Sequence, residues 1–157
     1  MVAMGVIWWG MCQAGKLRTR VEILKGIMSG LISTKNQIEF GKFNIGYIFK
    51  KIDVKDKGLF RLCGDNIAEM GIKSAWESAV KMALGDGVIK DKDKDTIFQL
   101  GKTLGMSDVK GQINNIDMVV AELERSILIA EDENVRLGKV YRQCGVLLGV
   151  FIMIILI

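Results

Sequence analysis

The sequence predicts an all-α protein, in which a cytoplasmic helical bundle is flanked by an N-terminal and a C-terminal membrane segment. Three observations predict it. All 40 charged residues of the 157-residue chain (22 basic and 18 acidic) lie between Lys16 and Arg142. The chain contains no proline, so nothing removes a backbone donor from a long helix. Apolar residues recur at spacings of three and four, and no strand-like alternation competes with them.

The two ends, residues 1–15 and 143–157, are the expected membrane segments. Neither contains a charged residue, and the run over 145–157 is apolar on every helical face. As a helix that run reaches only about 20 Å, which is short of the roughly 30 Å hydrocarbon core. Trp8 and Trp9 are residues that favour a membrane interface. Buried helices of a soluble protein are the alternative, and a secretory signal is disfavoured because no basic residue precedes the apolar run.

The charges beside these ends predict an orientation. Basic residues follow the first segment and precede the second: Lys16, Arg18, Arg20 and Lys25, then Arg136, Lys139 and Arg142. Both groups belong to the middle of the chain. The positive-inside rule therefore places residues 16–142 in the cytoplasm and both termini on the other side.

Apolar periodicity divides the first part of the middle into helices. They are expected over about 16–40 with an end near Gly41, over 45–52, over 59–70 with an end at Gly71, over 74–84 with an end at Gly85, and from about 91 to Gly105. Ser74 and Glu77 have the spacing of a capping box, in which each side chain satisfies a free backbone N–H at a helix start. We therefore expect the fourth helix to begin at Ser74.

The last element shows the most regular pattern. Residues in a heptad seam alternate spacings of four and three: Val109, Ile113, Ile116, Val120, Leu123, Ile127, Ala130, Asn134, Leu137, Tyr141, Cys144 and Leu148. The helix is expected to begin near Ser107, a good N-cap, and to run into the C-terminal membrane segment. The seam fits packing within the chain or against a partner helix. Gly145 and Gly149 form a small-xxx-small pattern that permits close helix contact in lipid, although chance also produces it.

The sequence offers no catalytic, cofactor-binding or metal-binding residue set. Histidine is absent, which removes the usual acid–base group near neutral pH. The acidic run over 91–95 imitates the start of a calcium loop, but Thr96 and Lys102 stand where that loop needs glycine and glutamate. We expect a solvated, charged helix start instead. A cation-sensing, membrane-tethered helical adaptor is kept as the alternative function.

Two further patterns are weak. Gly101, Lys102 and Thr103 resemble the end of a phosphate-binding loop, but its first glycine is missing and no strand precedes it. The net charge of +4 is mild, and no basic stripe with interleaved aromatics indicates nucleic-acid binding. Cys12, Cys63 and Cys144 are far apart and are expected to pack as small apolar residues. The chain is therefore expected not to be an enzyme.

Residues 100–112 carry a resemblance to a known family. This stretch resembles a motif of the stage III sporulation protein AB family at Gly101, Leu104, Gly105, Ser107, Asp108 and Gln112. The resemblance extends over essentially the whole chain, and the glycine-spaced apolar tail is similar too. The chain lacks the family's proline soon after Gly41, and its first apolar segment is short, which is compatible with a natural start further upstream.

The resemblance implies a function that the residues alone do not give. Members of the family resemble the inner-membrane platform protein of type II secretion and type IV pilus machines. A non-enzymatic platform subunit of the channel between mother cell and forespore is therefore expected, located in the mother-cell membrane around the forespore. Its expected partners are a cytoplasmic ATPase, stage III sporulation protein AA, and other channel subunits. The motif residues are expected to form a structural or interaction site, and no cofactor is implied.

Overall fold

The structure is a computed structural model that describes residues 2–40, 44–105 and 108–156, with side chains described at 15, 18–40, 44–105, 108–140 and 143–144. Its five helices are α1 (Val2–Phe40), α2 (Ile45–Lys51), α3 (Leu59–Leu84), α4 (Asp91–Leu100) and α5 (Val109–Leu156). No strand occurs in these described ranges. The predicted all-α class is confirmed.

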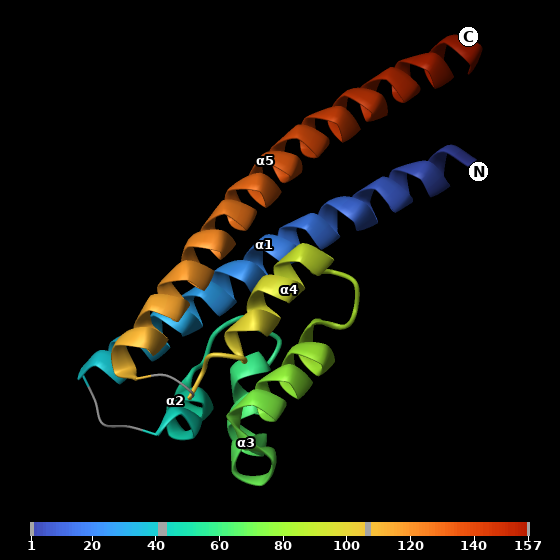
Figure 1. Cartoon of the computed structure of the whole chain (residues 1–157). Coiled ribbons are helices and arrows are strands. Elements are labelled where there is room, and N and C mark those ends of the chain that lie inside the picture. Colours follow the sequence, from blue (N-terminus) through green and yellow to red (C-terminus); the bar gives the residue numbers. More distant parts are fainter. Residues whose placement is uncertain (1, 41–43, 106–107, 157) are drawn as a thin grey trace.

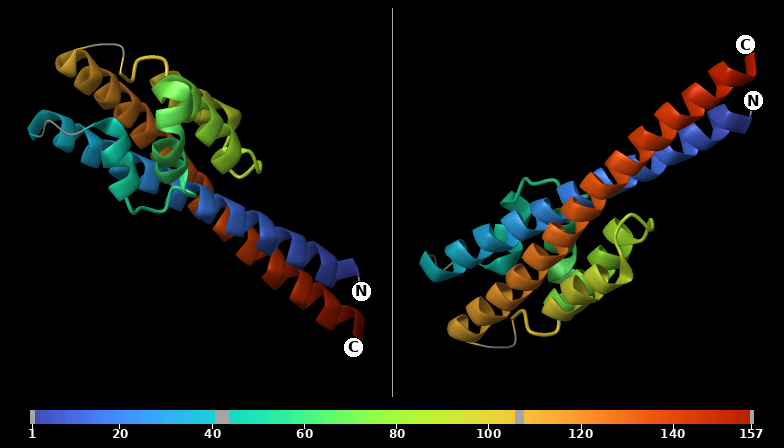
Figure 2. Two further views of the ribbon diagram at one scale, coloured as in Figure 1. Left: turned by 90° about the horizontal axis from the view of Figure 1, so that it is seen from below. Right: turned by 90° about the horizontal axis from the view of Figure 1, so that it is seen from above.

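The first and last helices, α1 and α5, pack side by side in antiparallel directions. This pair is here called the hairpin, although three helices lie between its members in the sequence. Their N- and C-terminal ends lie side by side and extend beyond the shorter helices in every view (Figures 1 and 2). Two ion pairs record the alignment: Lys35 with Asp117, and Lys25 with Glu131, each with a nitrogen–oxygen distance of 2.6 Å. These pairs are partly exposed, so they contribute little stability, but they fix which residues of α1 and α5 face one another.

Both long helices run through the boundaries expected at residues 15 and 143 without a break. The expectation that the last helix continues into the C-terminal segment is confirmed, whereas α1 begins at Val2 rather than near Lys16. Within the described residues, no helix offers a stretch that is both long and apolar enough to traverse a bilayer. Gly145 and Gly149 lie in α5, and the packing expected of them falls outside the described side chains.

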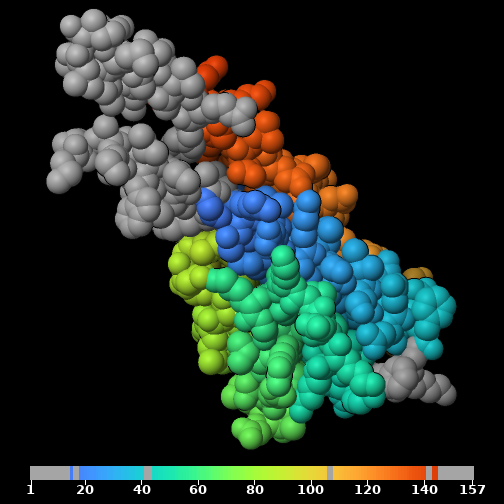
Figure 3. Space-filling view, turned by 180° about the vertical axis from the view of Figure 1, so that it is seen from behind, coloured from blue at the N-terminus to red at the C-terminus, as the bar shows by residue number. Residues whose placement is uncertain are grey.

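The shorter helices α2, α3 and α4, here called the side bundle, pack against one face of the hairpin. In Figure 3, which views the molecule from behind, the surfaces of α2 and α3 lie directly against that of α1. At the centre lie three rings, Phe49, Phe60 and Trp76, whose centroids are 5.3–5.9 Å apart. All three are fully buried. Rings at such separations gain stability beyond the area they bury, so they anchor the side bundle.

Two glycines let α1 approach the side bundle closely. A Cβ at Gly30 would stand 2.2 Å from Cε2 of Phe60, and one at Gly26 would stand 2.2 Å from the carbonyl oxygen of Lys55. The positions are four residues apart, so they share one face of α1. Any larger residue would force the helix away from the core. Nothing in the sequence pattern singled out this pair.

The middle of the heptad seam of α5 packs within the chain, which is the first of the two alternatives expected. Its buried members face α1 and the side bundle: Ile116, Leu123, Ile127 and Ala130. Towards the hairpin end the seam becomes more open, since Leu137 is exposed.

Cys63 is buried in α3, and this burial raises the pKa of its thiol to about 12. A thiol that stays protonated is unreactive, in agreement with the packing role expected of Cys63. Cys144 is exposed, so the packing role expected of it within the chain is wrong, and the side chain of Cys12 lies outside the described residues.

The predicted capping box at Ser74 is wrong. Helical structure continues from Leu59 to Leu84 with one kink at Gly71, where φ is +76° and ψ is 162°. The predicted break at Gly71 is therefore confirmed. Because Gly71 itself supplies the non-helical residue, the helix resumes at once and Ser74 lies inside it, where its spacing to Glu77 has no capping role.

Candidate functional site

The junction between α4 and α5 contains most of the motif residues that carried the family resemblance. Helix α4 ends at Leu100, not at Gly105 as predicted, because residues 101–105 form turns. The N–H groups of Thr103 and Leu104 both donate to the carbonyl of Leu100 at 3.1 Å. These tight turns satisfy the last carbonyls of α4 while redirecting the chain towards α5.

Two of the motif residues hold the turn against α3. A Cβ at Gly101 would stand only 2.4 Å from Cδ1 of Trp76. The indole Nε1–H of Trp76 donates to the carbonyl oxygen of Ile97 at 2.8 Å. Leu104 is buried in the core. The side chain of Trp76 thus fixes both the last turn of α4 and the residue that follows it, and Gly101 leaves the room for it.

The start of α5 is capped by Asp108. Its Oδ1 accepts a hydrogen bond from the N–H of Gly111 at 2.9 Å, which is the arrangement of an N-cap carboxylate. A negative charge there is also favoured by the positive end of the helix. Ser107, the other candidate cap, lies outside the described residues. Gln112 lies in the first turn of α5, half-buried, and its N–H donates to the carbonyl of Asp108 at 3.0 Å.

Gly105 adopts the left-handed conformation expected of it, with φ at +76°, and it permits a direct prediction. Gly105→Ala should destabilise the protein more than Gly87→Ala. Both positions have φ at +76°, so each alanine costs about 1 kcal/mol of backbone strain. Only at Gly105 would the Cβ also meet a neighbour, Cγ2 of Ile72 at 3.0 Å.

The measurement is thermal unfolding of the full-length chain for both variants. A loss of 1 kcal/mol lowers Tm by about 2–4 °C in a chain of this size. Equal losses at the two positions would mean that Ile72 yields to the new methyl group and that the contact has no structural role.

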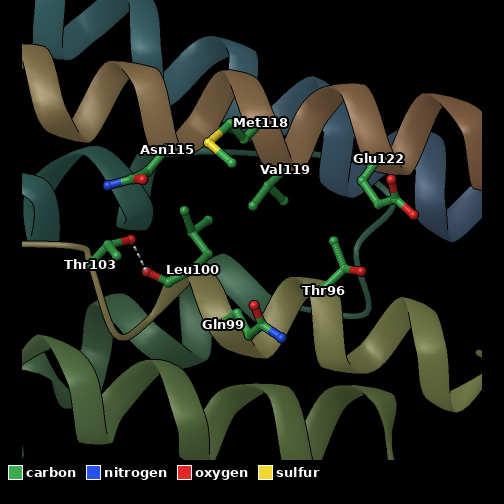
Figure 4. A pocket seen from close by; sticks show the side chains of 8 residues that line it. All are labelled: Thr96, Gln99, Leu100, Thr103, Asn115, Met118, Val119 and Glu122. Atoms are coloured by element: carbon green, nitrogen blue, oxygen red, sulfur yellow. Dashed lines mark hydrogen bonds between the residues drawn. The ribbon is translucent and has the colours of Figure 1, made fainter.

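A groove lies between the second half of α4 and the facing side of α5 (Figure 4). Its volume is about 330 Å³. It is lined by Thr96, Gln99, Leu100, Thr103, Asn115, Met118, Val119 and Glu122. In Figure 4 the α4 and α5 side chains face one another across it.

The chemistry of this groove suits protein contact. Hydroxyl and amide groups stand beside apolar side chains, and Met118 is 71% exposed. Glu122 forms an ion pair with Lys92 at 3.1 Å. An exposed methionine adapts its shape to different partners.

The first turn of α4 is tied to both hairpin helices by a charge cluster, here called the Arg20 network. Its members are Arg20, Lys90, Asp93 and Glu133. Nη2 and Nε of Arg20 donate to Oδ2 of Asp93 at 2.7 and 3.0 Å, and Nη1 reaches Glu133 at 3.3 Å. Lys90 donates to the same glutamate at 2.7 Å. One guanidinium of α1 thus contacts α4 and α5 together.

The prediction of a solvated, charged helix start at 91–95 is confirmed for Asp91 and Asp95, which are exposed, but it is wrong for Asp93. The side chains of Arg20 and Asp93 are only 4% and 2% exposed. The carboxylate of Asp93 binds the guanidinium of Arg20, whereas a calcium loop would have used such a carboxylate to bind a calcium ion. One sequence signal pointed here: Arg20 lies four residues before Leu24 on the apolar face of α1. A charge on such a face needs a buried partner.

The fold and the site define an antiparallel two-helix hairpin that carries a three-helix side bundle with a polar–apolar contact groove. The sequence profile of the family described as stage III sporulation protein AB matches residues 1–157. The chain belongs to this family, and the resemblance seen in the sequence is confirmed.

Two relatives agree with this assignment. The stage III sporulation protein AB of Bacillus subtilis (strain 168) is 23% identical over 161 residues, covering 99% of this chain and 94% of that protein. A solved structure of stage III sporulation protein AB (SpoIIIAB) is similar with a TM-score of 0.67 at 22% identity. The matched region covers 74% of this chain and 97% of the solved chain. At 22% identity, this structural similarity shows a shared fold.

Proposed function

We propose that this chain is a non-enzymatic platform subunit of the channel complex between mother cell and forespore, and that it couples a cytoplasmic ATPase to the membrane assembly. The ATPase is stage III sporulation protein AA, and other channel subunits are further partners. The central domain is cytoplasmic, and the chain is located in the mother-cell membrane around the forespore. Family membership supports the sporulation role, and the geometry of α4 carries the coupling role.

Helix α4 connects a contact surface to the hairpin. Its second half lines the groove with Thr96 and Gln99. Its first turn is held by the Arg20 network to α1 and α5 at once. A partner that seats in the groove and shifts α4 therefore also pulls on both long helices. Rigid helices and buried ion pairs are the kind of connection through which displacement passes in a packed protein.

The hairpin supports the membrane part of the proposal. Its free end consists of the two charge-free segments of the sequence, and the two helix ends lie side by side (Figure 2). Apolar surface without charge is the surface that lipid accepts. Both helices would then transmit a movement of the hairpin into the membrane.

The test is co-purification of the full-length chain, in detergent, with stage III sporulation protein AA. Met118→Lys should lower the affinity about tenfold or more, as expected when a charge replaces an apolar contact near the centre of an interface. Met82→Lys is the matched control. Met82 is 67% exposed on α3, against 71% for Met118, and lies outside the groove.

Both variants should keep the parent's circular dichroism spectrum and melting temperature, because both side chains are largely exposed. Loss of the ATPase with Met118→Lys alone supports the groove as the contact. Equal binding by both variants would remove the groove from the proposal, and no binding by the parent chain would contradict the partnership itself.

A further inference from the structure

The alignment of α1 with α5 brings two sequence-distant groups of cations to one level of the hairpin. Arg20 of α1 contacts Glu133 of α5. Arg18 lies two residues before Arg20, and Arg136 lies three residues after Glu133, so the antiparallel helices carry them to the same height. Lys139 follows one turn later on α5. Beyond this height neither helix contains another acidic residue.

These cations form the last charged layer before the charge-free end. We call the layer the cationic collar and define it by Arg18, Arg136 and Lys139; Lys16 and Arg142 follow them towards the hairpin end in the sequence. Arg18 and Arg136 are each 79% exposed, and Lys139 is exposed as well.

The acids near the collar lie on its side-bundle side, away from the hairpin end. Arg18 is 3.5 Å from Glu22, and Arg136 is 3.8 Å from Asp132, each about one turn further from the end. Such long, exposed pairs bind weakly. The guanidinium groups therefore stay available to a stronger anionic acceptor.

We propose that the cationic collar binds the phosphates of anionic phospholipids, at the surface of a membrane into which the charge-free end of the hairpin inserts. A guanidinium matches two phosphate oxygens at once, and an ammonium adds a point charge. The uncharged segments of both helices begin close to the collar, on its side towards the hairpin end. When these segments insert into the apolar layer of a membrane, the collar lies at the level of the lipid phosphates. The proposal rests on the membrane placement proposed above and is independent of the ATPase.

The arrangement also fixes how the hairpin stands. Cations from both helices share one level, so binding to a charged surface restrains α1 and α5 together. The side bundle then faces the aqueous phase, and the Arg20 network lies close beneath the surface because Arg20 is only two residues from Arg18 along α1.

The experiment measures partitioning of the full-length chain from detergent into vesicles of phosphatidylcholine, with and without phosphatidylglycerol, followed by flotation. The parent should prefer the anionic vesicles, and salt should weaken that preference. In the variant Arg18→Gln/Arg136→Gln/Lys139→Gln, the ratio of partitioning into anionic over neutral vesicles should be about 100-fold lower than in the parent. Each cation near such a surface contributes about a factor of five to this ratio.

The matched control removes the same three charges from the side bundle: Lys50→Gln/Lys51→Gln/Arg61→Gln. These residues are exposed and belong to α2 and α3, far from the hairpin end (Figure 1). The control should keep the parent's preference. The proposal is overturned if the control loses as much as the collar variant, or if the collar variant loses nothing.

The two proposals fail in different ways. A parent chain that enters neutral and anionic vesicles equally well would overturn the lipid-binding collar and leave the membrane placement standing. A parent that enters neither kind of vesicle would overturn both. Failure to bind the ATPase would not affect the partition measurements.

Discussion

Replacing Arg20 by methionine is expected to lower the free energy of unfolding by about 3–5 kcal/mol. The change leaves the carboxylate of Asp93, 2% exposed, without the guanidinium that now contacts it at 2.7 Å. A buried charge without a partner is among the most destabilising defects in a protein interior. Thermal unfolding of the full-length chain should show a fall in Tm of roughly 10 °C.

Lys25→Met is the matched control for Arg20→Met. Lys25 also joins α1 to α5, through Glu131 at 2.6 Å, but this pair is about half exposed. Its loss should cost at most about 1 kcal/mol. The double variant Arg20→Met/Asp93→Leu should recover much of the stability, because an apolar pair can replace a buried ion pair. Equal losses in the free energy of unfolding for Arg20→Met and Lys25→Met would show that the buried Arg20 network stabilises the fold no more than an exposed ion pair does.

Trp76→Ala should also cost about 3–5 kcal/mol, because it empties the centre of the side bundle. The indole is fully buried against Phe49 and Phe60, and its N–H satisfies the carbonyl of Ile97. Trp76→Phe keeps a ring but leaves that carbonyl without its donor, so a loss of about 1–3 kcal/mol is expected. Chemical denaturation of each variant measures both values.

A double-mutant cycle with Gly101 checks the reason for the effect of Trp76. Gly101→Ala alone should be destabilising, because its Cβ would stand 2.4 Å from the indole. In the Trp76→Ala background the obstruction is gone, and the same change should be nearly neutral. Additive losses would mean that Gly101 is required for another reason, such as the turn that follows α4.

Much of the fold could be predicted because it depends on local periodicity. The heptad seam of α5, with Leu123 and Ile127 buried, is visible in the spacing alone. The kink at Gly71 and the left-handed Gly105 follow from the one residue type that adopts such angles freely. The capping box at Ser74 failed because a neighbouring glycine had already interrupted the helix.

The candidate site was less accessible to sequence analysis because its contacts join distant residues. Arg20 and Asp93 are 73 positions apart, and no local pattern records their pairing. The glycines at 26 and 30 matter only because Lys55 and Phe60 approach them. The motif over 100–112 located the junction of α4 and α5, but the groove beside it also depends on Met118 and Glu122, which lie further along α5.

The pairing of the first helix with the last also determines the order in which the protein can be completed. The apolar face of α1, with Leu24, Ile27 and Leu31 fully buried in the final fold, leaves the ribosome long before α5 is synthesised. Arg20 and Glu133, which meet across this interface, are 113 positions apart. Contacts of such separation slow folding and leave apolar surface open to misassembly meanwhile. The nascent chain is therefore expected to depend on chaperone or membrane contact until its final helix emerges.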